Sequence, residues 1–153
     1  MEMTGEQLIM ARRETVWNAL NDPAVLKDCI PGCDMIEKLS NTEFSMGMTA
    51  AIGPIKAKFK GKLLLTNVDA PNSYELSFEG QGGMAGFAKG GSKVNLEPNG
   101  DSETRLAYVV NASVGGRLAQ VGSRLVDSAA KKIANEFFTR FQQLVDAQTS
   151  AGL

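Results

Sequence analysis

The sequence predicts an α+β domain in which a curved antiparallel sheet wraps around one long C-terminal helix. Two patterns support this prediction: strand-like alternation over much of residues 44–112 and a helix-like pattern over residues 117–147. The order of the elements is a third observation that supports the prediction. A run of strands followed by a helix is typical of an α+β domain in which the helix covers one face of the sheet. We expect one domain over residues 1–153, large enough to bury about two thirds of its unfolded surface.

The N-terminal part of the chain predicts one strand followed by two short helices. An Asp-Pro pair marks the start of the second helix, because Pro23 suits the first helical position and Asp22 can cap it. The sequence Ile-Pro-Gly-Cys then predicts a turn. In order, these elements are expected at residues 2–10, 13–21, 22–29 and 30–33.

Five stretches in the middle of the chain alternate between apolar residues and polar or small ones, which predicts five or six antiparallel strands. A period of two means that one face of each strand is buried and the other is wet, as in an antiparallel sheet. Turn sequences at residues 67–73 and 98–101 separate neighbouring strands. The stretches lie at residues 44–50, 57–65, 74–78, 94–96 and 106–112.

The C-terminal pattern is that of one amphipathic helix from Arg117 to about Ala147. At about 1.5 Å per residue this helix would be roughly 45 Å long, which is more than an ordinary cap needs. Gly122 and Ala129 lie on its apolar face, where a close-packed core usually has larger side chains. We therefore expect space between helix and sheet, as in a carrier of apolar ligands. The apolar residues recur at spacings of three and four: Leu118, Val121, Gly122, Leu125, Ala129, Ile133, Phe137, Phe141 and Leu144.

A glycine-rich segment from Gly80 to Gly91 admits two interpretations. It contains no GxxxxGK[ST] motif and strands flank it, whereas a phosphate-binding loop opens a helix. A mobile or bulged hairpin is therefore the favoured interpretation. Met84 and Phe87 lie at the tip of this hairpin, where they are expected to gate a cavity mouth or touch a membrane.

The absence of histidine removes much of the common catalytic and metal-binding chemistry. Neither a Ser-His-Asp triad nor a Cys-His pair can form, and His-ligated zinc or iron is excluded. Cys29 and Cys33 alone make a poor metal site, so free thiols and no metal are expected. Sixteen basic and seventeen acidic side chains nearly cancel, which gives no electrostatic basis for nucleic-acid binding. The sequence predicts neither a membrane span nor a signal peptide, so a cytoplasmic location is expected.

Four lysines at every second position from Lys56 to Lys62 form a basic ladder on a wet strand face. One interpretation is docking to anionic lipid or to an acidic partner. The favoured alternative is cross-strand pairing with Glu75 and Glu79, each exposed pair contributing only ~0–1 kcal/mol.

The predicted inner faces of the strands contain no Asp, Glu, Lys or Arg. A cavity without such groups lacks the means for general acid–base catalysis, so a binding site is expected rather than an active site. Tyr74 and Tyr108 could orient a carbonyl or a headgroup, although a packed core tyrosine is the more common case. Met46 and Met48 suit either an adaptable ligand surface or an irregular core.

Four segments resemble the CoxG family, whose members are the G subunits of carbon monoxide dehydrogenase. They are IPGC at residues 30–33, AIGPIK at 51–56, GFAKG at 86–90 and VGGRLAQVGSR at 114–124. The resemblance spans roughly residues 3–147 and implies the START-like (SRPBCC) helix-grip fold, with an apolar cavity between the sheet and the C-terminal helix. Longer relatives carry a C-terminal extension that can anchor to a membrane. This chain stops at Leu153, so either an extension is missing or attachment is peripheral.

The resemblance also implies an accessory role beside a molybdenum-containing CO dehydrogenase or a related hydroxylase. Family members are associated with recruiting that enzyme to the inner face of the cytoplasmic membrane, where its electrons enter the quinone pool. The implied ligand is a quinone (menaquinone or ubiquinone) or another isoprenoid lipid, with no covalent cofactor.

The leading hypothesis is a non-enzymatic carrier that holds an apolar lipid and links the dehydrogenase to the membrane. Two rivals stay open: an assembly factor without a ligand, and a START-like cyclase or aromatase that would depend on Tyr108. The residues expected to line the cavity are Trp17, Leu26, Met46, Met48, Phe59, Leu63, Phe78, Met84, Phe87, Tyr108, Leu118, Leu125 and Ala129.

Overall fold

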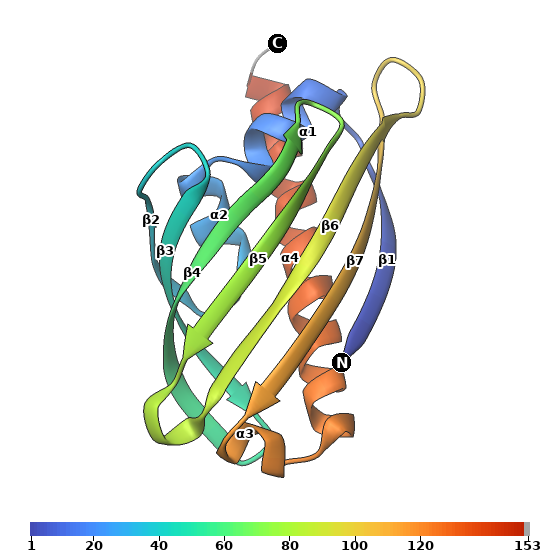
Figure 1. Cartoon of the computed structure of the whole chain (residues 1–153). Helices are drawn as coiled ribbons and strands as arrows, with labels where there is room; N and C mark the ends of the chain where they lie inside the picture. The colour runs from blue at the N-terminus through green and yellow to red at the C-terminus, as the bar shows by residue number, and fades with distance from the viewer. Residues whose placement is uncertain (152–153) are drawn as a thin grey trace.

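In the computed structural model, a seven-stranded antiparallel sheet curves around a long C-terminal helix (Figure 1). The structure describes the backbone of residues 1–151 and the side chains of residues 1–147, so residues 152 and 153 of the expected domain lie outside the described part. The strand order across the sheet is β1-β7-β6-β5-β4-β3-β2. The strands are β1 (Glu2–Ile9), β2 (Cys33–Lys38), β3 (Glu43–Ile52), β4 (Ile55–Asp69), β5 (Ser73–Gln81), β6 (Phe87–Pro98) and β7 (Thr104–Gly115).

The helices gather on one face of this sheet, and Figure 1 shows α4 running behind the strands. Two short helices follow β1, as predicted, and α2 is capped as its sequence indicates. Asp22 accepts a hydrogen bond from the backbone N–H of Ala24 at 3.0 Å, and Pro23 occupies the first turn. The helices are α1 (Arg13–Leu20), α2 (Pro23–Cys29), η1 (Gly83–Ala85), α3 (Arg117–Gln120) and α4 (Ser123–Ala151).

The C-terminal helix differs from the single helix predicted from Arg117 to Ala147. The chain forms a short α3, turns at Val121 and Gly122, and then begins α4 at Ser123. Gly122 has a φ of +97°, which a residue with a side chain rarely adopts, so the glycine marks a break rather than a gap in the apolar stripe. The expectation of one uninterrupted helix was wrong at this point.

Six strands follow the short helices, and the position of one of them, β2, was not predicted. It pairs with β3 at the sheet edge, and most of its residues are exposed on both faces. The glycine-rich segment forms a hairpin, as favoured above, with η1 as the turn between β5 and β6. The predicted turns around residues 67–73 and 98–101 also connect strands in the structure.

Buried side chains on the inner sheet face form two separate clusters. The upper cluster lies against α1, α2 and the C-terminal half of α4, where Phe141 and Val145 are fully buried. The lower cluster lies at the opposite end, next to η1 and α3, and its buried members are Ile55, Phe59, Ala85 and Leu118. The core is therefore concentrated at the two ends of the sheet.

Glycines between these clusters let neighbouring strands approach closely. A Cβ at Gly61 would collide with the carbonyl oxygen of Glu79, and a Cβ at Gly90 would collide with that of Asn111. Both glycines share the inner face with Leu63, as the strand pairing shows. At these two positions the inner wall is consequently formed by backbone, while larger side chains such as Leu63 stand beside them.

Candidate functional site

The inner face of the sheet carries no charged side chain on β1 or on any strand from β3 to β7. Strand pairing aligns Leu63 with Phe78 and Leu65 with Leu76, so that the lysines of β4 alternate onto the outer face. The inner positions of these strands are apolar, small or uncharged polar residues, as the sequence predicted. This surface has nothing with which to bind a charged ligand or to transfer protons at neutral pH.

The central inner surface, between the upper and lower clusters, is only half-buried. On the sheet it comprises Met46, Gly61, Leu63, Gly80 and Ala112, all of intermediate exposure. A close-packed protein interior would cover such positions almost completely. Apolar surface is therefore available beneath the middle of α4, which is where the sequence predicted the ligand to bind.

The helix face opposite this surface is built from small and aromatic side chains. Ala129 and Ile133 are half-buried and share a face with Phe137 and Phe141, because residues three and four apart lie side by side on a helix. Among the strands, α4 approaches β3 and β1, near the two edges of the sheet, most closely. The small Ala129 side chain thus leaves this part of the helix face half-buried.

A lateral groove of about 530 Å³ opens between β1 and α4. Phe138 forms part of its wall and stacks on Tyr108 with ring centroids 5.4 Å apart and planes 23° apart. The backbone N–H of Met10 donates to Gln142 Oε1 at one end of the groove. Its lining residues are Gln7, Leu8, Ile9, Asn135, Phe138, Thr139, Gln142 and Gln143.

Sequence reasoning missed these groove residues. The groove residues with side-chain amides occupy polar positions of the amphipathic sequence pattern. Such positions look like ordinary solvent-exposed ones. The only signal was the pair Phe137 and Phe138, because two adjacent aromatics cannot both face the same side of a helix. Phe138 turns toward β7, and this widens the aromatic face of α4.

Burial disfavours the ionisation of both tyrosines. Burial raises the pKa of Tyr108 and, more strongly, that of Tyr74, because a charged phenolate would be poorly solvated there. Tyr74 is in edge-to-face contact with Trp17 in the upper cluster. It is therefore a packed core tyrosine, the more common case named in the sequence analysis. Tyr108 lies across Gly5, where a Cβ would collide with its ring.

The predicted lining residues divide into three groups. Trp17, Leu26, Leu63 and Tyr108 pack with the upper cluster, and Met48, Phe59 and Leu118 pack with the lower one. Met46, Phe78, Phe87 and Ala129 are half-buried. Met84 and Leu125, however, lie on the surface at the lower end, with side chains 86% and 41% exposed.

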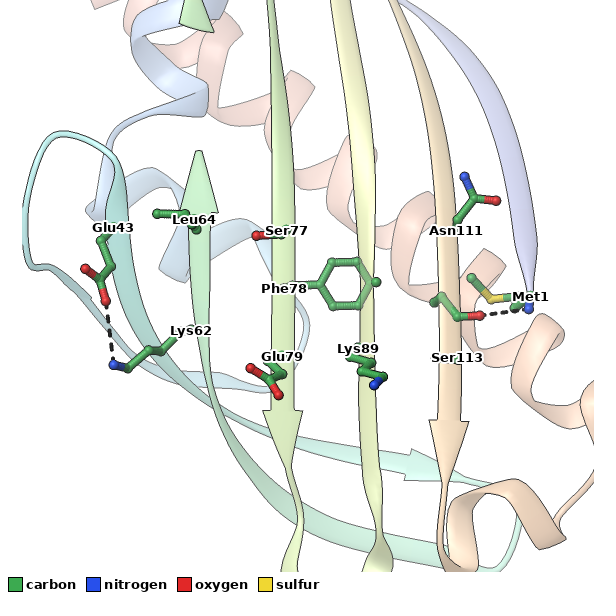
Figure 2. Close-up of a pocket in the computed structure, with 12 residues that line it drawn as sticks. Met1, Glu43, Lys62, Leu64, Ser77, Phe78, Glu79, Lys89, Asn111 and Ser113 are labelled. Atoms are coloured by element: carbon green, nitrogen blue, oxygen red, sulfur yellow. Dashed lines mark hydrogen bonds and ion pairs between the residues drawn. The ribbon is translucent and has the colours of Figure 1, made fainter. Parts of the chain in front are cut away.

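A second hollow, of about 910 Å³, lies on the outer face of the sheet and was not predicted (Figure 2). Figure 2 shows Lys62 beside Glu43, and Glu79 and Lys89 on neighbouring strands. The Lys62 ammonium and the Glu43 carboxylate are 3.6 Å apart. Opposite charges in this wide hollow therefore neutralise one another, and it does not resemble a site for a particular ligand.

The lysine ladder forms the expected cross-strand pairing only in part. Lys62 lies opposite Glu79 in the strand register, but its ion pair is with Glu43. Glu75 lies opposite Thr66 and Lys93 rather than opposite a ladder lysine. The other three lysines of the ladder have no acidic residue opposite them in either neighbouring strand.

The two cysteines are free thiols, and burial raises the pKa of each. A raised pKa disfavours the thiolate, which is the form that binds metals or attacks substrates. Within residues 1–151, no three His, Cys, Asp or Glu side chains come together in a way that could hold a metal ion. No helix in that part of the chain is long and apolar enough to cross a bilayer.

Comparisons with known proteins agree with this architecture. The model of the family described as the G subunit of carbon monoxide dehydrogenase (CoxG) matches residues 5–146. A conserved protein from Geobacillus kaustophilus, whose crystal structure is known, is 29% identical over 96% of each chain, with a TM-score of 0.89. No curated protein matches the chain.

More distant solved structures share the fold alone. A START superfamily protein from Mycobacterium smegmatis is 13% identical, with a TM-score of 0.73 over 96% of this chain and 98% of the other. The ZhuI aromatase/cyclase from Streptomyces sp. R1128 is 7% identical, with a TM-score of 0.73 over 97% of this chain and 95% of the other. These likenesses identify the fold as the START-like helix-grip fold.

Proposed function

This chain belongs to the CoxG family of carbon monoxide dehydrogenase, and from that premise we propose that it is a non-enzymatic accessory protein that binds an apolar lipid. The ligand would lie between α4 and the central inner surface of the sheet. A quinone, or another isoprenoid lipid, is the proposed ligand class. The protein would link a molybdenum CO dehydrogenase, or a related hydroxylase, to the cytoplasmic face of the membrane and its quinone pool.

One observation carries the ligand proposal: apolar side chains beneath the middle of α4 are half-buried although no charged group accompanies them. Leu63 and Met46 remain partly exposed on the sheet, and Ala129 and Ile133 on the helix. Each 100 Å² of apolar surface that a ligand covers contributes about 2.5 kcal/mol before ordering costs are subtracted. An apolar ligand is the chemistry that such a surface favours.

The lateral groove supports a polar headgroup at one end of the ligand. Side-chain amides of Gln7, Asn135 and Gln143 line it, and such groups donate hydrogen bonds to carbonyl oxygens. The Gln142 amide, in contrast, already accepts from Met10 and donates to Asp146. The aromatic ring of Phe138 beside them suits a flat ring system. A quinone combines a flat ring, two carbonyls and an apolar tail.

Native mass spectrometry of protein purified gently from its own host, followed by solvent extraction, tests this proposal. A stoichiometric quinone or prenyl lipid is the expected result. In parallel, a quinone with a short isoprenoid chain should quench the single tryptophan, Trp17, in a saturable manner. Protein that is isolated empty and also fails to take up added quinone would contradict the proposal.

An assembly factor without a ligand is the second candidate, and one observation favours it. The two hollows described above lie on the outer sheet face and at the β1–α4 edge, not enclosed beneath the middle of α4. For that candidate, the dehydrogenase should bind the protein equally well after delipidation. A cyclase or aromatase is disfavoured, because the inner face of β1 and of β3 to β7 holds no acid or base beyond neutral phenols.

A further inference from the structure

Net positive charge is concentrated at one end of this protein. We define the basic end as residues 48–60, 81–89 and 114–127, which contain six of the sixteen basic residues but only one of the seventeen acidic ones. The net charge of −1 therefore divides into +5 for the basic end and −6 for the remainder. Its charged residues are Lys56, Lys58, Lys60, Lys89, Arg117, Arg124 and Asp127.

These three segments lie together in space, although they are far apart in the sequence. The lower cluster joins Ile55 of β4, Ala85 of η1 and Leu118 of α3. A Cβ at Gly53, in the β3–β4 turn, would touch the side chain of Leu125 at 2.8 Å. In Figure 1, η1, α3 and the start of α4 meet at the lower end of the molecule.

Lys56, Lys58 and Lys60 have no acidic residue opposite them in a paired strand. Lys89, however, lies opposite Glu79, and the Asp34 carboxylate lies over Gly47, next to Lys60. Lys58 lies opposite Thr49, and Lys60 lies between Gly47 and Gln81. All six basic side chains are exposed, and none forms an ion pair with another described residue. A cluster of this kind attracts an anionic surface over roughly a Debye length, about 8 Å at physiological salt.

An exposed apolar side chain stands at the same end. Met84 projects from η1 with 86% of its surface exposed, while the other large exposed hydrophobic residues are between 38% and 50% exposed. η1 begins at Gly83 and is followed by Gly86, and their φ angles of +60° and +108° favour glycine. Leu125, 41% exposed, lies at the same end, at the start of α4. An apolar tip within a basic collar is the composition of a membrane-interface anchor.

We propose that the basic end docks on an anionic lipid surface, with the exposed Met84 side chain entering the interface between headgroups and acyl chains. This inference rests on the proposed function, which brings the protein to a membrane, and it adds which end faces the lipid. Docking in this orientation puts the lower cluster, and hence one end of the central inner surface, next to the bilayer. An apolar ligand would then pass between protein and membrane without crossing water.

Sedimentation with lipid vesicles tests the docking surface. The wild-type protein should bind vesicles containing phosphatidylglycerol far better than vesicles of phosphatidylcholine alone, and high salt should weaken this binding. Replacing Lys56, Lys58 and Lys60 together by Gln should reduce partitioning by about 100-fold, because each basic residue near an anionic surface contributes about a fivefold factor. Met84→Asp should reduce it by roughly fivefold or more.

Matched control variants act outside the basic end. The triple variant Lys27→Gln, Lys38→Gln and Lys132→Gln changes the net charge equally but at positions in the rest of the chain. Val68→Asp places a carboxylate at an exposed apolar residue far from Met84 in the fold (47% exposed). Both controls should bind vesicles within about twofold of the wild type, and circular dichroism should show that every variant is folded.

Three results would overturn the proposal: equal binding to neutral and anionic vesicles, no vesicle binding at all, or equal losses in the two triple variants. Retention on an immobilised acidic protein without vesicle binding would assign the basic end to a protein partner instead. The vesicle assay requires neither quinone nor dehydrogenase. Quinone binding without vesicle binding therefore contradicts only the docking surface, and vesicle binding without quinone uptake contradicts only the ligand.

Discussion

The two ends of this molecule are built differently. At the upper end, α1, α2 and the last turns of α4 enclose a large cluster in which Phe141 and Val145 are completely buried. At the basic end, a small cluster supports a surface with an exposed methionine and lysines that form no ion pair with a described residue. The difference indicates that one end maintains the fold while the other is available for contact. The half-buried central inner surface lies between them.

Replacing a fully buried aromatic residue at the upper end should have the largest effect. Phe141→Ala removes a ring that stacks on Phe137 with centroids 5.7 Å apart. We expect the free energy of unfolding to fall by about 3–5 kcal/mol, since the ring leaves a cavity in a well-packed cluster. Urea unfolding followed by circular dichroism measures the change. A loss below about 1 kcal/mol would contradict the assignment of stability to this end.

The corresponding substitution at the basic end should cost less. Leu118→Ala truncates the most buried side chain of the lower cluster, which has few fully buried neighbours. A loss of about 2–3 kcal/mol is expected, at the lower end of the range for such truncations. The same urea experiment compares both variants. If Leu118→Ala were as destabilising as Phe141→Ala, the contrast between the ends would be incorrect.

Filling the space beneath α4 should weaken ligand binding more than it affects stability. Ala129→Phe adds a ring to the half-buried helix face above the central inner surface. We expect at least a tenfold loss of quinone affinity, about 1.4 kcal/mol, because the ring takes the volume of the ligand. Quenching of Trp17 fluorescence measures the affinity. Ser128→Phe, which adds the same ring at the exposed neighbouring position, is the control and should bind quinone normally.

Alkaline pH should destabilise the upper end through its buried phenol. Because the folded-state pKa of Tyr74 is raised by burial, its stabilising contribution is complete below the unfolded pKa near 10 and is lost as pH rises above that value. The free energy of unfolding should fall by at most about 1.4 kcal/mol per pH unit for this group. Tyr74→Phe should flatten the profile above about pH 10. A profile unchanged by that substitution would show that the phenol is not decisive.

Much of the fold could be predicted because its strands alternate regularly. The lysines of β4 alternate with Phe59 and Leu63, and this pattern alone assigned each to the correct face. β2 escaped prediction because an edge strand exposed on both sides has no reason to alternate. The break before α4 was missed because Gly122 continues the helical spacing, and only its positive φ shows that the helix cannot continue.

The candidate site was harder to predict than the fold. Periodicity indicates which face a residue occupies but not how far along the element the neighbouring layer extends. Leu118 and Leu125 belong to the same predicted stripe, yet the first is buried and the second is on the surface. Similarly, the sequence marked Met84 as a hairpin tip, but only the structure shows how little of it the described chain covers.

The glycines in the middle of the sheet have a consequence for how binding preference could diversify. At Gly61 and Gly90 even a methyl group would collide with the main chain of the next strand. At these two positions the wall is main chain, and exchanging one residue for another cannot recontour it. New ligand shapes would have to be accommodated by substitutions elsewhere. Such positions are Ala129 and Ile133 on α4, or the flexible Met46 on β3.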